Sequence, residues 1–171
     1  MSTLHVENLK GLSSGSNANK IIVPSGQTLT AAGHIVQVVT NTYSTETTSG
    51  SSSFSDTGIT ATITPTSTSS KILVLCNLGS AGVMNSSGAD ANGYYKLLRG
   101  STDLTQGLQR VYDYGNSGHI AFGQLLMSWL DSPSTTSATT YKLQQRLTSG
   151  SSIRVCEGNN PSVMHLLEVA Q

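Results

Sequence analysis

Short runs in which apolar and polar residues alternate constrain this chain more than any other feature. In the segment GITATIT, Ile59, Ala61 and Ile63 are separated by single threonines. The segment TTYKLQQRL repeats the pattern, with one set of alternate positions formed by Tyr141, Leu143, Gln145 and Leu147. A period of two places such a set on one face of a β-strand. The pattern therefore predicts strands with one buried and one exposed face.

Six further segments have the apolar and β-branched content of strands: IVQVVTNTY, KILVLCNL, GYYKLLR, GHIAFGQLLMSWL, SIRVCE and SVMHLLEVA. KILVLCNL is apolar on both faces, which is typical of a central strand. GHIAFGQLLMSWL could form a helix, but Gly123 at its middle and its lack of charge favour a strand. The connections are rich in Gly, Ser, Asn and Pro. The eight segments predict an all-β fold, an antiparallel β-sandwich of about eight strands with a jelly-roll-like order.

The composition agrees with strands and points to association. Serine and threonine make up 48 of the 171 residues, against 9 Lys plus Arg and 9 Asp plus Glu. A helical protein needs more charged residues on its outer faces, whereas threonine suits a pleated surface. The formal net charge of zero provides no basic patch for nucleic acid or for a membrane surface. Because a near-zero charge favours association, we expect an assembly subunit, with a neutral monomer as the alternative.

The first 34 residues differ from the rest of the chain. They comprise the weakly alternating STLHVENL, the linker GLSSGSNAN and the short element KIIVPSGQTLTAAG, none of which can bury a core alone. We expect residues 1–34 to be an extended anchoring arm and residues 35–171 to be the sandwich domain. The apolar residues expected to anchor the arm are Leu4, Val6, Leu9, Ile21, Ile22 and Val23. The start lacks the pattern of a secretory signal, and no apolar run has the roughly 18 residues of a spanning helix, so we expect no membrane insertion.

Residues that could support catalysis or metal binding are scattered. The four histidines share no ligand spacing, and they are His5, His34, His119 and His165. His165 alternates with Val163 and Leu167, which favours a core or interface position. The chain has no G-x-S-x-G motif and no glycine-rich phosphate loop, and SSGADANG lacks the acids of a calcium loop. These patterns predict a protein that is not an enzyme and that holds no cofactor or metal.

Two other features bear on chemistry and recognition. Cys76 and Cys156 show no metal-binding spacing. We expect both to be free thiols, and a disulfide between them is the alternative. The segment RVYDYGNSGHI places tyrosines beside hydrogen-bonding side chains in a predicted loop, a combination that suits contact with a carbohydrate or a protein. The candidate receptor-contact residues are Tyr112, Asp113, Tyr114 and Asn116. The alternative is that these tyrosines pack into the end of the sandwich.

Several phrases of the sequence together resemble small structural proteins of tailed phages, of the tail-fibre-like type. They are STLHVENLKG, KIIVPSGQTLTAAG, FSDTGITATITPTSTSSKILVL, YKLLRGST, SWLDSPSTTSATTYKLQ and MHLLEVA. The resemblance implies a virion protein without enzymatic activity, a homotrimer of jelly-roll-like domains whose arms attach to other virion proteins of the tail or capsid. It also implies a host surface glycan or protein as receptor. This chain departs from long fibres because it has no extended shaft.

The resemblance leaves three functions open. The first is a short tail fibre or receptor-binding head that is anchored by its arm. The second is a capsid decoration protein that clamps neighbouring capsomers. The third is a carbohydrate-binding module or a glycan-cleaving tail enzyme.

Overall fold

A computed structural model describes residues 13–16, 20, 25, 31–86, 90–111 and 119–171 of the chain. The chain divides into two compact units, residues 1–31 and residues 32–171. In the first unit, residues 13–16 form a bend around Gly15, whose φ of +94° favours glycine. The second unit holds all the described strands.

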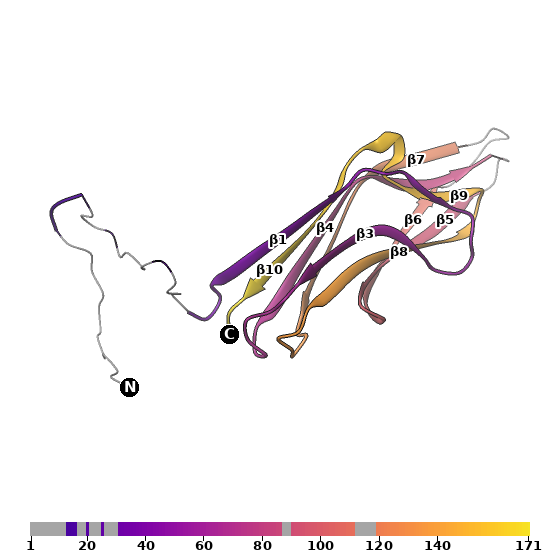
Figure 1. The fold of residues 1–171 in the computed structure, drawn as a ribbon. Helices are drawn as coiled ribbons and strands as arrows, with labels where there is room; N and C mark the ends of the chain where they lie inside the picture. The colour runs from indigo at the N-terminus through magenta and orange to yellow at the C-terminus, as the bar shows by residue number, and fades with distance from the viewer. Residues whose placement is uncertain (1–12, 17–19, 21–24, 26–30, 87–89, 112–118) are drawn as a thin grey trace. The chain divides into compact units, whose positions relative to one another are not determined.

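The described part of the second unit contains ten strands and one short 3₁₀ turn, η1 (Figure 1). The strands are β1 (Ile35–Tyr43), β2 (Thr47–Ser49), β3 (Ser55–Ile63), β4 (Lys71–Asn85), β5 (Ala91–Arg99), β6 (Thr102–Val111), β7 (His119–Asp131), β8 (Thr139–Ser149), β9 (Ser152–Val155) and β10 (Ser162–Val169); η1 spans Glu157–Asn159.

The first sheet, called sheet A here, consists of four antiparallel ribbons, although six strands contribute to it. The long strand β4 pairs with β7 along one side. Along its other side it pairs first with β10 and then with β9. In turn β1 pairs with β10, and β2 pairs with β9. Strands β9 and β10 thus follow one line, as do β1 and β2, and the ribbon order is β1/β2, β10/β9, β4, β7 (Figure 1).

The second sheet, called sheet B, has the order β3, β8, β5, β6, and all its pairings are antiparallel. Eight ribbons in these two orders form the two Greek keys of a jelly roll. The predicted all-β sandwich is therefore confirmed. The sequence patterns missed β2 and β6. Strand β6 has few apolar residues because it lies at the edge of sheet B, and its pairing with β5 is set by the tight turn at Gly100, whose φ is +55°.

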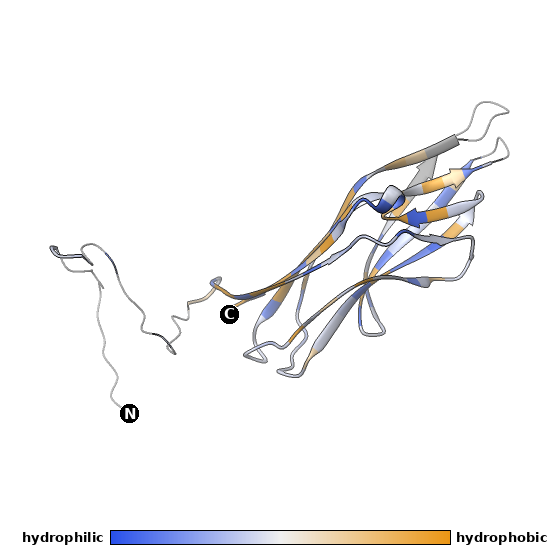
Figure 2. Cartoon of the chain, turned by 45° about the horizontal axis from the view of Figure 1, so that its top comes forward, coloured by the Kyte–Doolittle hydropathy of each residue, from blue (hydrophilic) through white to orange (hydrophobic). Residues whose placement is uncertain are grey.

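The core lies between the two sheets and is built from the alternate positions that face inward. Along the strands in Figure 2, hydrophobic residues (orange) and hydrophilic residues (blue) are interspersed. Ile59, Ala61 and Ile63 are buried, as the alternation predicts. From β4, four residues at alternate positions are buried with them: Ile72, Val74, Cys76 and Leu78. Cys76 and Cys156 are both free and buried, which agrees with the favoured reading of two thiols. Burial raises the pKa of the Cys76 thiol to about 12, and the charge of Cys156 adds to the rise.

Two glycines of β4 allow the backbone to approach its neighbours closely. A Cβ atom on Gly82 would lie 1.8 Å from the carbonyl oxygen of Ala121 in β7. A Cβ atom on Gly79 would lie 2.1 Å from the carbonyl oxygen of Pro161. Gly79 faces residues 156–161, which leave the line of β9 and β10 through η1. Glycine at position 79 therefore leaves room for this excursion, and glycine at position 82 lets β4 and β7 pair closely.

Candidate interaction surface

The outer faces of the two sheets differ in chemistry, and the outer face of sheet B is polar. Lys142 forms an ion pair with Asp56 at 3.0 Å, and Lys96 forms one with Asp103 at 3.0 Å. A hydrogen bond from Gln144 is the main influence that holds the pKa of Asp56 below its ordinary value; Lys142 adds to it and partial desolvation opposes it. Such pairs on an exposed face are well solvated and keep this side of the sandwich compatible with water.

Two aromatic rings on the same side of sheet B are stacked with cations. The Lys96 Nζ lies 4.1 Å from the centre of the Phe54 ring, and the Arg146 guanidinium lies 4.8 Å from it. Arg146 is also 4.9 Å from the ring of Tyr94. Both rings are partly exposed. Aromatic rings beside cations and hydrogen-bonding groups also occur in ligand-binding sites.

One end of the outer face of sheet A is apolar across all four ribbons. One row of paired residues crosses all four ribbons: Val38 of β1, Leu167 of β10, Leu73 of β4 and Leu130 of β7. Val38 is 56% exposed and Leu130 is 50% exposed. A row of four apolar side chains on the outside of a sheet is typical of a surface that another molecule covers, and it is uncommon on a sheet that faces water.

The next two rows in the direction of β9 are mixed. They run Thr40, His165, Leu75, Ser128 and Thr42, Val163, Asn77, Leu126. The partly exposed His165 lies on the same face as Val163 and Leu167, as the alternation predicts, and its Nδ1 is 2.9 Å from the hydroxyl of Thr40. We call Val38, Leu73, Leu75, Val163 and Leu167 the apolar face. Its polar neighbours are mostly uncharged, which is typical of interface cores.

The apolar surface continues onto β7, which forms one edge of sheet A. Leu126 is 64% exposed, and Trp129 is 42% exposed at the open side of the sandwich. Leu108 of β6, at the matching edge of sheet B, is 49% exposed. A shallow groove of about 280 Å³ separates the two edges and is lined by residues 105–107 and 125–128. We call Leu126, Trp129 and Leu130 the β7 edge. Leu126 and Leu130 lie on the outer face of sheet A, whereas Trp129 pairs with the inward-facing Val74. Leu108 pairs with Tyr94 and lies on the outer side of sheet B.

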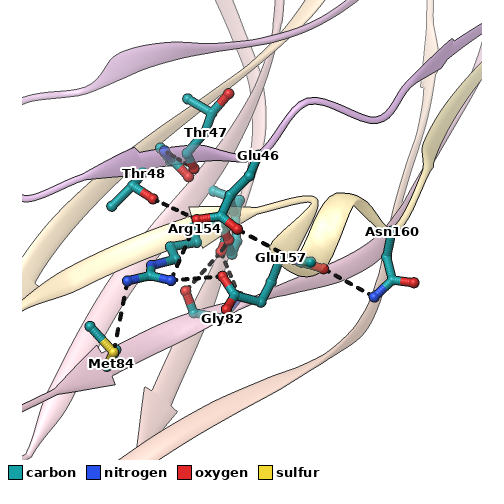
Figure 3. Close-up of polar contacts among 11 residues, drawn as sticks. Glu46, Thr47, Thr48, Gly82, Met84, Arg154, Glu157 and Asn160 are labelled. Carbon is teal, nitrogen blue, oxygen red and sulfur yellow. Dashed lines mark hydrogen bonds and ion pairs between the residues drawn. The ribbon is translucent and has the colours of Figure 1, made fainter.

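An ionic cluster lies on the outer face of sheet A at the end where β9 pairs with β2 and β4 (Figure 3). Arg154 of β9 donates to the carboxylate of Glu157 at 2.9 Å and to that of Glu46 at 3.4 Å. Glu46 in turn accepts from the backbone N–H of Gly158 at 3.3 Å, and the guanidinium lies near the sulfur of Met84. The outer face of sheet A is therefore apolar at one end and polar at the other.

Buried polar groups hold the frame of this surface. The Tyr141 hydroxyl of sheet B donates to Asp131 of β7 at 2.7 Å, and Arg99 pairs with the same carboxylate at 2.8 Å. Burial, and then the hydrogen bond to Asp131, raise the pKa of Tyr141 well above its usual range. Burial likewise raises the pKa of Tyr95, whose hydroxyl bridges to backbone groups of Gly82 in sheet A. These contacts tie the end and the middle of sheet A to sheet B.

A carboxylate fixes the other edge, where β1 lies. Glu168 of β10 is fully buried and accepts hydrogen bonds from the N–H and the hydroxyl of Thr66, at 2.8 and 2.7 Å. It also accepts a bond of 2.6 Å from the Gln37 side chain of β1. Burial alone would raise the pKa of Glu168, but the bonds from Gln37, Ser70 and Thr66 hold it below its ordinary value. The polar loop TPTSTSS between β3 and β4 is thus organised around this carboxylate.

The site residues predicted from the sequence lie outside the described part of the chain. This holds for the candidate receptor loop of Tyr112, Asp113, Tyr114 and Asn116. It also holds for the arm residues Leu4, Val6, Leu9, Ile21, Ile22 and Val23. Their contacts stay predictions. Sequence reasoning missed the apolar face and the β7 edge, although the uncharged run IAFGQLLMSWL and the two apolar faces of KILVLCNL were signals of them.

The described residues were also searched for a metal site and for a membrane-spanning helix. Among them, no three His, Cys, Asp or Glu side chains gather as they would around a metal ion. None of the helical segments in the described ranges is long and apolar enough to span a membrane. Comparison with known protein families found no match, and comparison with curated proteins found no relative.

Proposed function

We propose that this chain is a non-enzymatic structural protein of a tailed-phage virion, a short tail fibre or receptor-binding head. In this proposal it assembles as a homotrimer through the sandwich, and residues 1–34 anchor it to other virion proteins. The resemblance of its sequence phrases to small phage structural proteins supports the virion assignment. The jelly-roll order of the strands is compatible with it, because viral structural proteins use this fold among many other proteins.

The observation that carries the assembly part is the contrast between the two outer faces. Sheet B has ion pairs such as that between Lys142 and Asp56, whereas sheet A has the apolar row from Val38 to Leu130. A solvated monomer rarely leaves such an apolar row uncovered, and large exposed apolar patches are typical of interaction sites. The zero net charge removes the repulsion that would oppose association of identical copies.

Light scattering of the purified chain tests the assembly. We expect a mass near three times the 17.9 kDa of one chain. A stable monomer at micromolar concentration would refute the assembly. Immunogold labelling of intact particles then tests the location, since tail labelling supports a fibre and head labelling supports the decoration protein. Absence of the chain from particles would refute both.

Deletion of residues 1–33 tests the anchoring role. We expect the remaining chain to fold, because the described core and the partly buried residues packed on it all lie at or after Val39. We also expect it to lose attachment to particles. The far-UV circular dichroism spectrum and the thermal unfolding midpoint report folding, and co-sedimentation with particles reports attachment. An unfolded product would show that these residues belong to the core.

The stacked rings on sheet B favour a second candidate, a carbohydrate-binding module. Phe54 and Tyr94 lie beside Lys96 and Arg146, and glycans are bound by aromatic rings flanked with hydrogen-bonding groups. Incubation of the pure protein with host polysaccharide tests it, with Tyr94→Ala as the variant and Tyr43→Ala as a comparison away from this face. Binding without cleavage that is lost in Tyr94→Ala supports the module, and cleavage would indicate a tail enzyme.

A further inference from the structure

We propose that the outer face of sheet B holds a binding site for an acidic sugar, in which the guanidinium of Arg146 receives the carboxylate of the sugar. The inference rests on the receptor-binding role proposed above, and it narrows the receptor to one chemical class. In this site the rings of Phe54 and Tyr94 hold the guanidinium in place, and the partly exposed ring of Tyr94 also stacks against the sugar.

Arg146 differs from the other cations of this face because no carboxylate balances it. Lys142 lies 3.0 Å from an oxygen of Asp56. Lys96 lies 3.0 Å from an oxygen of Asp103. Within the described ranges, the structure pairs no carboxylate with Arg146, and its buried Nε has no hydrogen-bond acceptor. Arg146 is partly exposed, so an anion can reach its side chain from solvent.

Two aromatic rings fix the position of this guanidinium. Its central carbon lies 4.8 Å from the centre of the Phe54 ring and 4.9 Å from that of the Tyr94 ring. Both distances are within the roughly 6 Å over which a ring attracts a cation. Because the rings already restrict Arg146, its side chain loses less entropy when a ligand binds. The planar N–H groups of arginine also match the two oxygens of a carboxylate, which favours a carboxylate as the bound group.

The charge around Arg146 favours a sparsely charged ligand over a dense polyanion. Three rows of paired residues cross sheet B at Tyr94, Lys96 and Leu98. The charged residues of these rows are three cations and two carboxylates, which leaves a single positive charge: Arg146, Lys96, Lys142, Asp56 and Asp103. A nucleic acid would bring many phosphates close to the two carboxylates, and like charges repel. A sugar with an isolated carboxylate balances the site.

The groups beside Arg146 suit a sugar ring. Tyr94 lies opposite Arg146 in the pairing of β5 with β8, and Gln144 lies opposite Lys96 in the next row. Aromatic rings bury the apolar side of a ligand, and amide side chains form hydrogen bonds with hydroxyl groups. A shallow hollow of about 220 Å³, lined by Lys96 and residues 103–106, opens beside this row. The hollow gives room for a neighbouring sugar unit of the same chain.

Matched polysaccharides that differ only in charge test the inference. Oligosaccharides of hyaluronan and of gellan carry isolated glucuronates among neutral sugars, and carboxyl reduction removes the charge but keeps the backbone. We expect the wild-type chain to bind at least one acidic form about 10-fold or more tightly than its reduced form in isothermal titration, because reduction removes a hydrogen bond between charged groups. Poly-glutamate, which has carboxylates but no sugar ring, should bind more weakly. Binding to neither acidic form, equal affinity for the reduced forms, or equal affinity for poly-glutamate would overturn the inference.

Two glutamine variants test the assignment to Arg146. Arg146 and Lys142 occupy alternate positions on the same outer face of β8, so Arg146→Gln and Lys142→Gln remove the same charge from the same surface. We expect Arg146→Gln to lose the preference for the acidic form, whereas Lys142→Gln keeps it. The thermal unfolding midpoint of each variant reports that the sandwich is intact. An equal loss in both variants would indicate a general attraction of opposite charges and would overturn the inference.

Chemical modification gives a readout that needs no variant. Phenylglyoxal modifies accessible arginines, and mass spectrometry locates the modified residues. We expect the acidic oligosaccharide to protect Arg146 and to leave the modification of Arg99, which is paired with Asp131, unchanged. Absence of protection at Arg146 would place the sugar elsewhere and overturn the inference. These assays use the isolated chain, so absence of the chain from particles would refute the proposed function without changing their result.

Discussion

Replacing Glu168 with glutamine tests whether one buried carboxylate holds the β3–β4 loop and the edge strand β1 in place. Glu168 is fully buried, and its two oxygens accept three bonds of 2.6–2.8 Å from Gln37 and Thr66. The glutamine variant keeps an oxygen for Thr66 but turns an NH₂ group toward the amide of Gln37. Gln37 cannot simply rotate, because the same NH₂ group donates to the carbonyl oxygen of Thr64 at 2.7 Å.

The expected cost follows from these contacts. The variant loses one hydrogen bond to a charged group and brings two donors together, which costs about 1.5–3 kcal/mol of unfolding free energy. For a domain of this size, such a loss lowers Tm by roughly 5–10 °C. Glu46→Gln is the control, because Glu46 lies at the surface and its pair with Arg154, at 3.4 Å, contributes at most about 1 kcal/mol.

The pH dependence gives the sharper result. Because the pKa of Glu168 in the folded chain lies below its ordinary value of 4.5, its contribution is fully present above that value. It is lost as the pH falls through the folded pKa. Urea unfolding at fixed protein concentration should therefore show a gap between wild type and Glu168→Gln at pH 7 that narrows below about pH 4. A gap that is zero at pH 7, or equally wide at pH 3, would refute the reasoning.

Three further predictions concern the frame of the sandwich. Gly82→Ala should prevent folding or cost more than about 3 kcal/mol, because its Cβ would meet the carbonyl oxygen of Ala121, whereas Gly123→Ala, with nothing within 4 Å, should change Tm by less than about 2 °C. Tyr141→Phe should cost about 1–2 kcal/mol in urea unfolding at pH 7. Because the pKa of Tyr141 is raised in the folded chain, its contribution to stability is lost as the pH rises above the ordinary value of 10.0. The difference in unfolding free energy between wild type and Tyr141→Phe should therefore shrink above that pH. Cys76 should react with a thiol reagent only after the chain is unfolded, since it is buried and its pKa is about 12, and rapid labelling of both cysteines in the native protein would contradict the burial.

The strands of this protein were predictable where the signal is local. Alternation in residues 59–63 and 139–147 follows from the two-residue period of a strand, and it identified the buried side chains correctly. Strand β6 was missed because an edge strand needs little apolar content, and its pairing with β5 depends on the turn at Gly100. The partners of Glu168 lie 102 and 131 residues away along the chain, so no local pattern could reveal them.

By itself, the amino-acid sequence determined that this chain forms strands, that they are half buried, and that its surface carries little charge. It also showed that residues 71–78 are apolar on both sides, from which a central strand was predicted. The tertiary structure confirms that β4 is central and adds that the side bearing Leu73 and Leu75 faces outward in the described sandwich. Period-two alternation separates two faces but cannot say which is covered. That depends on how ribbons distant in the chain align, and here the alignment joins Val38, Leu167, Leu73 and Leu130 into one apolar row.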